Sequence, residues 1–214
     1  MPGLFISFEG IDFCGKTVQC GLLRKSLEAA DYPVVALREP GGTKISEAVR
    51  HVLLDVDHAA MSARTEILLY SAARAQIVYE TIQPALVENK IVIADRFADS
   101  TTAYQGYGRN IDLDFVRRVN DFATAELLPN VTFFIDVPVS TAVERQKNSG
   151  RSVDRLEGEA ALFHERVRDG YLAIARESGG RFITIDGQQI IEEIALDIRK
   201  HLSTKFSLNI ADSK

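Results

Sequence analysis

Tryptophan is absent from this chain of 214 residues, and cysteine is scarce, with only two residues. The two cysteines, Cys14 and Cys20, are too few and wrongly spaced for a zinc site or a disulfide framework. No apolar run approaches the roughly 20 residues of a membrane-spanning helix, and no basic stretch opens the chain as in a signal peptide. We therefore expect a cytoplasmic protein without a membrane partner.

Basic residues are not in excess either. The chain carries 25 Lys and Arg against 30 Asp and Glu, a formal net charge of −5. Nucleic-acid binding generally needs a basic surface, so we expect no nucleic-acid partner.

Short apolar segments rich in β-branched residues alternate with longer segments of helical periodicity. Such alternation is typical of a parallel sheet covered by helices on both faces. We predict one α/β domain over residues 1–214, with a polar lid at 147–157 and a weakly ordered tail at 203–214. The predicted strands are 4–9, 33–37, 90–94, 131–137 and 181–185. The predicted helices are 17–30, 43–54, 62–88 with a bend near Pro84, 112–126, 139–147, 159–178 and 188–202.

The segment GIDFCGKT at 10–17 fits the pattern G-x-x-x-x-G-K-[ST] and stands between a predicted strand and a predicted helix. In this setting, backbone N–H groups and the helix N-terminus bind phosphate. Lys16 reaches the β- and γ-phosphates, and the Thr17 hydroxyl can ligate Mg²⁺. We predict a P-loop NTPase fold of five parallel strands and a nucleoside triphosphate site. This site comprises Gly10, Ile11, Asp12, Phe13, Cys14, Gly15, Lys16 and Thr17.

Acidic residues near this loop need separate explanations. Asp12 lies inside the cradle, where an acid repels polyphosphate, so we expect it to accept a hydrogen bond from a substrate hydroxyl or to orient Mg²⁺ through water. Asp95 ends an apolar strand in the manner of a Walker B motif and is expected to assist Mg²⁺. Asp136 ends another strand and competes for that role.

Several arginines are placed to converge on the same site. Arg38 and Arg96 follow predicted strands, while Arg151 and Arg155 lie in the polar lid segment. Ligands of open parallel sheets bind beyond the carboxyl ends of the strands, so the first two are expected to face the crevice that holds Lys16. In a chain of negative net charge, this convergence indicates a polyanionic ligand, such as a triphosphate together with a second phosphate.

Tyr70 and Arg74 are four residues apart on a predicted helix and therefore share a face. An aromatic plane beside a guanidinium could hold a base and its phosphate. The alternative is a core tyrosine with an arginine that extends to the surface.

Together these segments resemble the thymidylate kinases, a family of nucleoside monophosphate kinases. The resemblance covers about residues 4–202, and its REPGGT and DRF…AYQG segments are specific to this family. It implies transfer of phosphate from ATP to dTMP, Mg²⁺ as a cofactor and a homodimer formed through helix faces. The matching segments are EGID at 9–12, REPGGT at 38–43, YSAAR at 70–74, DRF at 95–97, STTAYQG at 100–106 and DRLE at 154–157.

The resemblance also implies which residues hold the sugar and the phosphate of dTMP. Asp12 would bind the 3′-hydroxyl, and Arg38 and Arg96 would hold the acceptor phosphate. Tyr104 would crowd the 2′ position and so disfavour ribonucleotides.

For the base, the resemblance implies that Tyr70 stacks on thymine. Arg74 and Thr101 would reach the edge of the base, and Gln105 would line the same pocket.

Members of this family carry their catalytic arginine either in the cradle or in the lid. Phe13 and Cys14 occupy the cradle here, so the lid is expected to supply the charge. Arg151 is the first choice and Arg155 the second. With Lys16, Arg96 and Asp12, they complete the predicted catalytic group.

Overall fold

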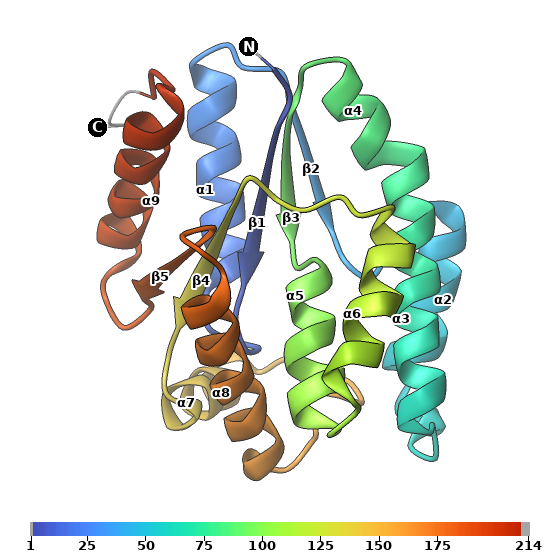
Figure 1. Cartoon of the computed structure of the whole chain (residues 1–214). Coiled ribbons are helices and arrows are strands. Elements are labelled where there is room, and N and C mark those ends of the chain that lie inside the picture. Colours follow the sequence, from blue (N-terminus) through green and yellow to red (C-terminus); the bar gives the residue numbers. More distant parts are fainter. Residues whose placement is uncertain (1, 211–214) are drawn as a thin grey trace.

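The computed structural model describes residues 2–210 and contains a five-stranded parallel sheet with the order β2-β3-β1-β4-β5. Helices cover both faces of the sheet (Figure 1). The predicted α/β fold is confirmed, and each strand lies within one residue of its predicted bounds. The strands are β1 (Leu4–Glu9), β2 (Val34–Arg38), β3 (Ile91–Asp95), β4 (Val131–Asp136) and β5 (Phe182–Asp186).

The helices follow the strands along the chain. They are α1 (Lys16–Ala29), α2 (Lys44–Leu54), α3 (Ala63–Ile77), α4 (Gln83–Val87), α5 (Ala98–Thr101), α6 (Leu113–Thr124), α7 (Val139–Ser149), α8 (Ala161–Glu177) and α9 (Ile191–Phe206). Shorter elements are the 3₁₀ turn η1 (Val56–His58) and the π-helical segments η2 (Val78–Ile82) and η3 (Thr102–Gly108). None of the helices within residues 2–210 has the length and apolar character needed to cross a membrane.

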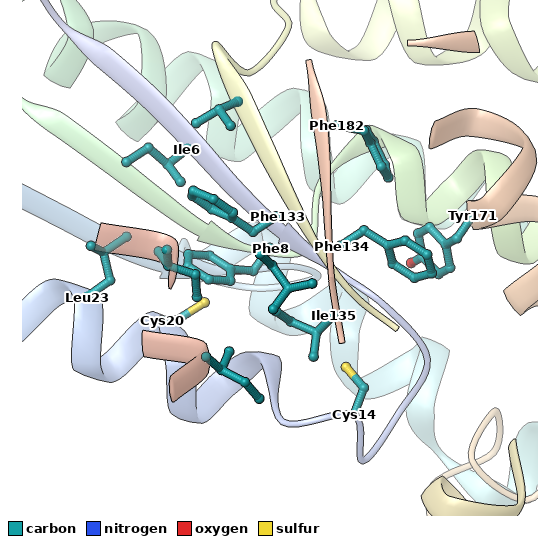
Figure 2. Close-up of a cluster of buried hydrophobic side chains, with 14 of the residues drawn as sticks. Ile6, Phe8, Cys14, Cys20, Leu23, Phe133, Phe134, Ile135, Tyr171 and Phe182 are labelled. Carbon is teal, nitrogen blue, oxygen red and sulfur yellow. The ribbon is translucent and has the colours of Figure 1, made fainter. Parts of the chain in front are cut away.

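Both faces of β1 are buried, so its carboxyl end is a rigid base for the loop that follows. Phe8 belongs to the same apolar cluster as Leu23 of α1 (Figure 2). Phe5 of the same strand belongs to a second cluster and meets the Phe97 ring edge-on, with 4.8 Å between the ring centroids. Alternate side chains of a strand point to opposite faces, which explains this division.

The predicted helix at 62–88 is divided into α3, η2 and α4. Pro84 stands at the start of α4, lacks an N–H donor and cannot continue a regular helix from the residues before it. The wider turn of η2 directly precedes it. The expected bend near this proline therefore takes the form of a π-helical segment.

The helical segments α5 and η3 were not predicted. Gly106 and Gly108 lower the helix propensity of this stretch. A Cβ atom at Gly108 would lie 2.7 Å from the Phe163 ring and 2.9 Å from Val167, so the glycine permits close packing of η3 on α8. The helicity therefore depends on tertiary packing rather than on local propensity.

The prediction of a weakly ordered tail at 203–214 was wrong for the part that can be described. Helix α9 continues to Phe206, and Leu208 and Ile210 are only 2% and 8% exposed. Their apolar side chains pack into the main core, which the helical periodicity up to Leu202 did not reveal. Residues 211–214 of the predicted tail lie outside the described residues.

Candidate functional site

A cavity of about 500 Å³ lies at the carboxyl end of the sheet. It is bordered by the loop after β1, the ends of β2 and β3, the helical segment after β3 and the lid. The predicted site residues that line it are Asp12, Phe13, Gly15, Lys16, Thr17, Arg38, Tyr70, Asp95, Arg96, Thr101, Tyr104, Gln105 and Arg151. The predicted residues outside its lining are Gly10, Ile11, Cys14, Arg74 and Arg155.

The loop that enters α1 has the geometry of a phosphate cradle. Gly15 caps the helix with φ 102°, and no side chain caps the N–H groups at the start of this helix. Gly10 has φ 144°, and a Cβ atom there would lie 2.7 Å from the carbonyl oxygen of Ile135. Only glycine therefore fits this position. The Lys16 side chain turns back toward the loop, with its Nζ 3.3 Å from the carbonyl oxygen of Ile11.

Cys14 lies behind the cradle rather than in it. Its side chain is 1% exposed, and burial raises the pKa of the thiol. The thiol is therefore protonated at neutral pH and fills space in the core, while the backbone of the residue continues the loop.

The structure distinguishes the two aspartates that could serve Mg²⁺. Asp95 lines the cavity and accepts a hydrogen bond of 2.5 Å from the Thr17 hydroxyl. Asp136 instead forms a two-point ion pair with Arg168, with contacts of 2.7 and 2.9 Å, and does not line the cavity. Hydroxyl and carboxylate oxygens suit Mg²⁺, so Thr17 and Asp95 form the donor set that fits this ion.

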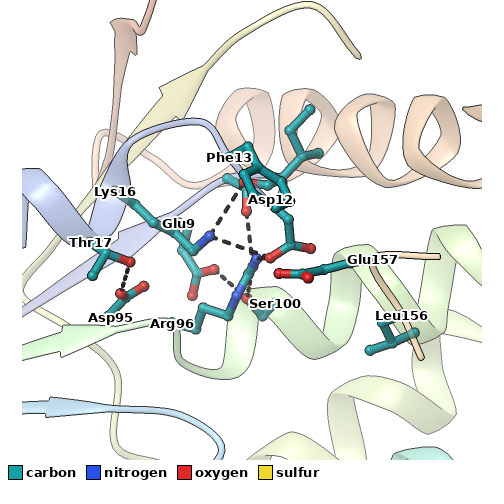
Figure 3. A network of polar contacts seen from close by, with 12 residues as sticks. Glu9, Asp12, Phe13, Lys16, Thr17, Asp95, Arg96, Ser100, Leu156 and Glu157 are labelled. Atoms are coloured by element: carbon teal, nitrogen blue, oxygen red, sulfur yellow. Dashed lines mark hydrogen bonds and ion pairs between the residues drawn. The ribbon is translucent and has the colours of Figure 1, made fainter. Parts of the chain in front are cut away.

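Asp12 is held at the centre of a charged network (Figure 3). Its carboxylate accepts hydrogen bonds from Arg96 Nη2 at 2.6 Å and from Tyr104 Oη at 2.7 Å, and lies 3.7 Å from Lys16 Nζ. Burial opposes the charged form, but Arg96 and Lys16 outweigh it and hold the pKa of Asp12 well below its usual range. Asp12 is therefore an ionised hydrogen-bond acceptor at the wall of the cavity.

Arg96 is fixed by partners on several elements. Its backbone has φ 74°, an unusual conformation for a residue with a side chain. Its Nη1 donates to the carbonyl oxygen of Gly10 at 2.9 Å, to Ser100 Oγ at 3.1 Å and to Tyr171 Oη at 3.2 Å. The guanidinium is thus oriented before any ligand binds, which reduces the entropy cost of holding an anion.

Glu9 lies beneath this arginine and was not found from the sequence. Its carboxylate accepts hydrogen bonds from the Phe97 amide at 2.7 Å, Ser100 Oγ at 2.6 Å and Tyr171 Oη at 2.9 Å. Burial and nearby Asp99 raise the pKa of Glu9 to about 7, against the opposing effect of the hydrogen bonds. The carboxylate fixes the turn after β3 and two of the groups that orient Arg96.

Arg38 reaches the cavity from the end of β2. Its Nη2 lies 3.1 Å from both carboxylate oxygens of Glu47, and its Nη1 donates to the carbonyl oxygen of Pro40 at 2.9 Å. Both members of the ion pair are partly exposed, so the pair contributes little stability.

Tyr70, Thr101 and Gln105 form another part of the cavity wall. Arg74 lies behind this wall and is 1% exposed. It donates to Glu39 Oε2 and to Thr101 Oγ1, each at 2.7 Å. Arg74 therefore orients the Thr101 hydroxyl, and the alternative of an arginine that extends to the surface does not hold.

The two lid arginines have different surroundings. Arg151 lines the cavity, pairs with Glu157, and has its guanidinium carbon 4.9 Å from the centre of the Phe13 ring. Arg155 is buried instead, 2.7 Å from the carboxylate of Glu66. The structure thus places Arg151 at the cavity and Arg155 in a buried ion pair with Glu66.

Two further arginines line the cavity and were missed from the sequence. Arg50 of α2 donates to the carbonyl oxygen of Pro40 at 2.9 Å, and Arg145 of α7 donates to those of Cys14 at 3.1 Å and Gly187 at 2.8 Å. Both stand within helices, where no strand end or motif marks them.

Comparison with known proteins identifies the family of this chain. A family model described as "Thymidylate kinase" matches residues 8–198. The chain belongs to the thymidylate kinase family. This confirms the resemblance drawn from the motifs.

Thymidylate kinases of several bacteria align with most of the chain. That of Geotalea uraniireducens is 47% identical, with 89% of this chain and 92% of the relative covered. That of a Thermoanaerobacter species is 48% identical, with coverage of 92% and 96%. The crystal structure of the thymidylate kinase from Ehrlichia chaffeensis shares the fold with a TM-score of 0.77 and 36% identity, covering 94% of this chain and 99% of that one.

Proposed function

We propose that this protein transfers the γ-phosphoryl group of ATP to the phosphate of dTMP and releases ADP and dTDP. One observation carries the proposal: a single cavity joins a phosphate cradle at Lys16 to a second cationic site at Arg38 and Arg96 and to a base pocket at Tyr70. Two phosphates can therefore meet end to end. Membership of the thymidylate kinase family supports thymidylate as the acceptor.

On the donor side, the amides of residues 10–17 and the Lys16 ammonium hold the triphosphate. Thr17 and Asp95 would hold Mg²⁺, which when bound supplies positive charge to the phosphate oxygens. Their hydroxyl and carboxylate already lie together at the wall of the cavity.

On the acceptor side, the ionised Asp12 accepts a hydrogen bond from the sugar 3′-hydroxyl, while Arg38 and Arg96 hold the phosphate. Tyr104 donates its hydroxyl to Asp12, so in this proposal the tyrosine ring lies beside the sugar. This position supports its proposed role of crowding a 2′-hydroxyl.

In the base pocket, Tyr70 stacks on thymine, and Thr101 and Gln105 face the edge of the base. Arg74 contributes through Thr101, whose hydroxyl accepts one of its hydrogen bonds. Direct contact between Arg74 and the base is not required by this arrangement.

The proposed reaction requires little proton transfer by the protein. An oxygen of the dTMP phosphate already carries negative charge, so it can form the new P–O bond as the bond from the γ-phosphorus to the bridging oxygen of ATP breaks. Catalysis then consists of positioning and charge stabilisation. We assign the additional transition-state charge to Arg151, the lid arginine that lines the cavity.

We further propose a homodimer in the cytoplasm. Large apolar side chains are exposed on neighbouring elements: Tyr79 of η2 is 75% exposed, Leu68 of α3 is 58% exposed and Phe122 of α6 is 87% exposed. We propose these exposed apolar side chains as the contact surface of the dimer. Sedimentation at micromolar concentration that shows only monomer would contradict the dimer.

The function is tested with ATP, Mg²⁺ and a panel of nucleoside monophosphates, with products separated by chromatography. We expect dTMP to give the highest kcat/KM and dTDP as the product. Equal kcat/KM values for dTMP and UMP would contradict the assignment of the sugar and base pocket.

A further inference from the structure

Glu66 lies near the start of α3, outside every motif discussed above, and its side chain is 0% exposed. A fully buried carboxylate is costly unless several donors satisfy it. Gln105 Nε2 donates to Oε1 at 2.9 Å, and Arg109 Nε and Nη2 donate to Oε1 and Oε2, each at 3.1 Å. Arg155 Nη2 lies 2.7 Å from Oε2.

One of these donors belongs to the base pocket. Gln105 lines the cavity, and its amide has a hydrogen-bond donor on one branch and an acceptor on the other. The ionised carboxylate of Glu66 can only accept, so it pairs with the NH₂ branch. The carbonyl oxygen of Gln105 is then the acceptor left for a ligand.

The orientation of this amide matters for base selection. Thymine carries an N–H at ring position 3, whereas cytosine has an unprotonated nitrogen there. A carbonyl oxygen held in the pocket attracts the first and repels the second. A site that enforces donor and acceptor orientation discriminates far better than a merely apolar one.

Of the other two contacts of Glu66, Arg155 belongs to the lid and Arg109 follows η3. Arg155 contacts Glu66 directly and also donates its Nε to the carbonyl oxygen of Leu53, at the end of α2. Arg109 extends the same network, because its Nη1 lies 2.6 Å from the carboxylate of Glu159, just beyond the lid. One carboxylate thus connects the base pocket with the lid.

We propose that Glu66 is a positioning residue that orients the Gln105 amide for a thymine-type base and anchors the lid through Arg155. Base recognition and lid placement then depend on the same buried group. The inference rests on the proposed function, because it takes dTMP as the acceptor.

The test is Glu66→Gln, which keeps the shape but can donate as well as accept, so the Gln105 amide is no longer forced into one orientation. Two quantities are measured: the ratio of kcat/KM for dTMP to that for dCMP, and the rate of trypsin cleavage after Arg151 with and without dTMP. We expect the ratio to fall about tenfold, as for loss of one oriented hydrogen bond. We also expect dTMP to slow cleavage in the unmodified protein and not in the variant.

One further variant controls for a general loss of stability, and a second separates the lid from base selection. Asp136→Asn removes another two-point ion pair, outside the cavity lining, and should change neither quantity. Arg155→Ala breaks only the connection to the lid, so it should speed cleavage and leave the dTMP to dCMP ratio unchanged. If Glu66→Gln does not fold, Arg155→Ala still tests whether the lid depends on Glu66 and whether that dependence is separate from base selection.

The proposal is overturned if Glu66→Gln keeps the normal ratio and the normal protection by dTMP, or if it loses only one of them. It is also overturned if Arg155→Ala lowers the ratio or leaves cleavage unchanged. Failure of the unmodified protein to phosphorylate dTMP would instead contradict the proposed function, so the two failures are distinguishable.

Discussion

Arg151→Ala should lower kcat with little effect on the free energy of unfolding, whereas Arg155→Ala should lower the free energy of unfolding with little effect on kcat. Arg151 has a side chain 60% exposed and one carboxylate partner, so Arg151→Ala should change the free energy of unfolding by less than about 1 kcal/mol. Because the Arg151 guanidinium supplies charge to the transition state in our proposal, the substitution should lower kcat by about 10³, or about 4 kcal/mol in activation free energy.

Arg155 is 6% exposed against a fully buried Glu66. Removing one member of a buried ion pair typically costs about 3–5 kcal/mol. Because Arg109 and Gln105 still satisfy Glu66, we expect Arg155→Ala to lower the free energy of unfolding by about 3 kcal/mol and kcat by less than about tenfold.

The assay is kcat from coupled ADP release at saturating ATP and dTMP, with urea unfolding of the same preparations. Arg168→Ala is the matched control, since this arginine pairs with Asp136 outside the cavity lining. A large loss of kcat in Arg155→Ala, with Arg151→Ala close to normal, would refute the reasoning.

Three further predictions concern Glu9, the two candidate Mg²⁺ aspartates and Tyr104. Burial raises the pKa of Glu9 to about 7, so the folded protein binds more protons than the unfolded chain between about pH 4.5 and 7, and stability from Glu9 is lost as the pH rises through this window. Glu9→Gln should shrink the drop in unfolding free energy from pH 5 to pH 8 by about 2 kcal/mol, and an unchanged drop in urea titrations would contradict this. Asp95→Asn should raise the Mg²⁺ concentration for half-maximal rate by about tenfold or more, whereas Asp136→Asn should not; equal effects would leave the two aspartates unresolved by function and contradict the assignment. Tyr104→Ala should raise kcat/KM for UMP relative to dTMP by about tenfold, and an unchanged ratio would remove the argument from crowding at the 2′ position.

The sheet and the phosphate cradle could be predicted because their signals are local. The strands are short apolar runs. The loop at 10–17 is marked by Gly10, where only glycine fits the backbone, and by Lys16, whose side chain is expected to bind phosphate. The fold of α5 and η3 could not be predicted, because Gly106 and Gly108 argue against a helix until the packing on α8 is known.

Within the site, residues at strand ends and in motifs were found, whereas two arginines that stand within helices were not. Arg38 and Arg96 are marked by their place after strands, whereas Arg50 and Arg145 stand within helices. Sequence pattern also cannot pair residues far apart along the chain. The ion pair of Arg155 with Glu66, which separates it from Arg151, became visible only in three dimensions.

The most direct test of the central claim is dTDP formation by Lys16→Ala, measured with ATP and dTMP beside direct dTMP binding and circular dichroism. The account predicts loss of dTDP formation to background, with the fold and dTMP binding retained, because Lys16 serves the donor end of the cavity. Turnover close to that of the unmodified protein would contradict the claim that this cradle holds the phosphate being transferred.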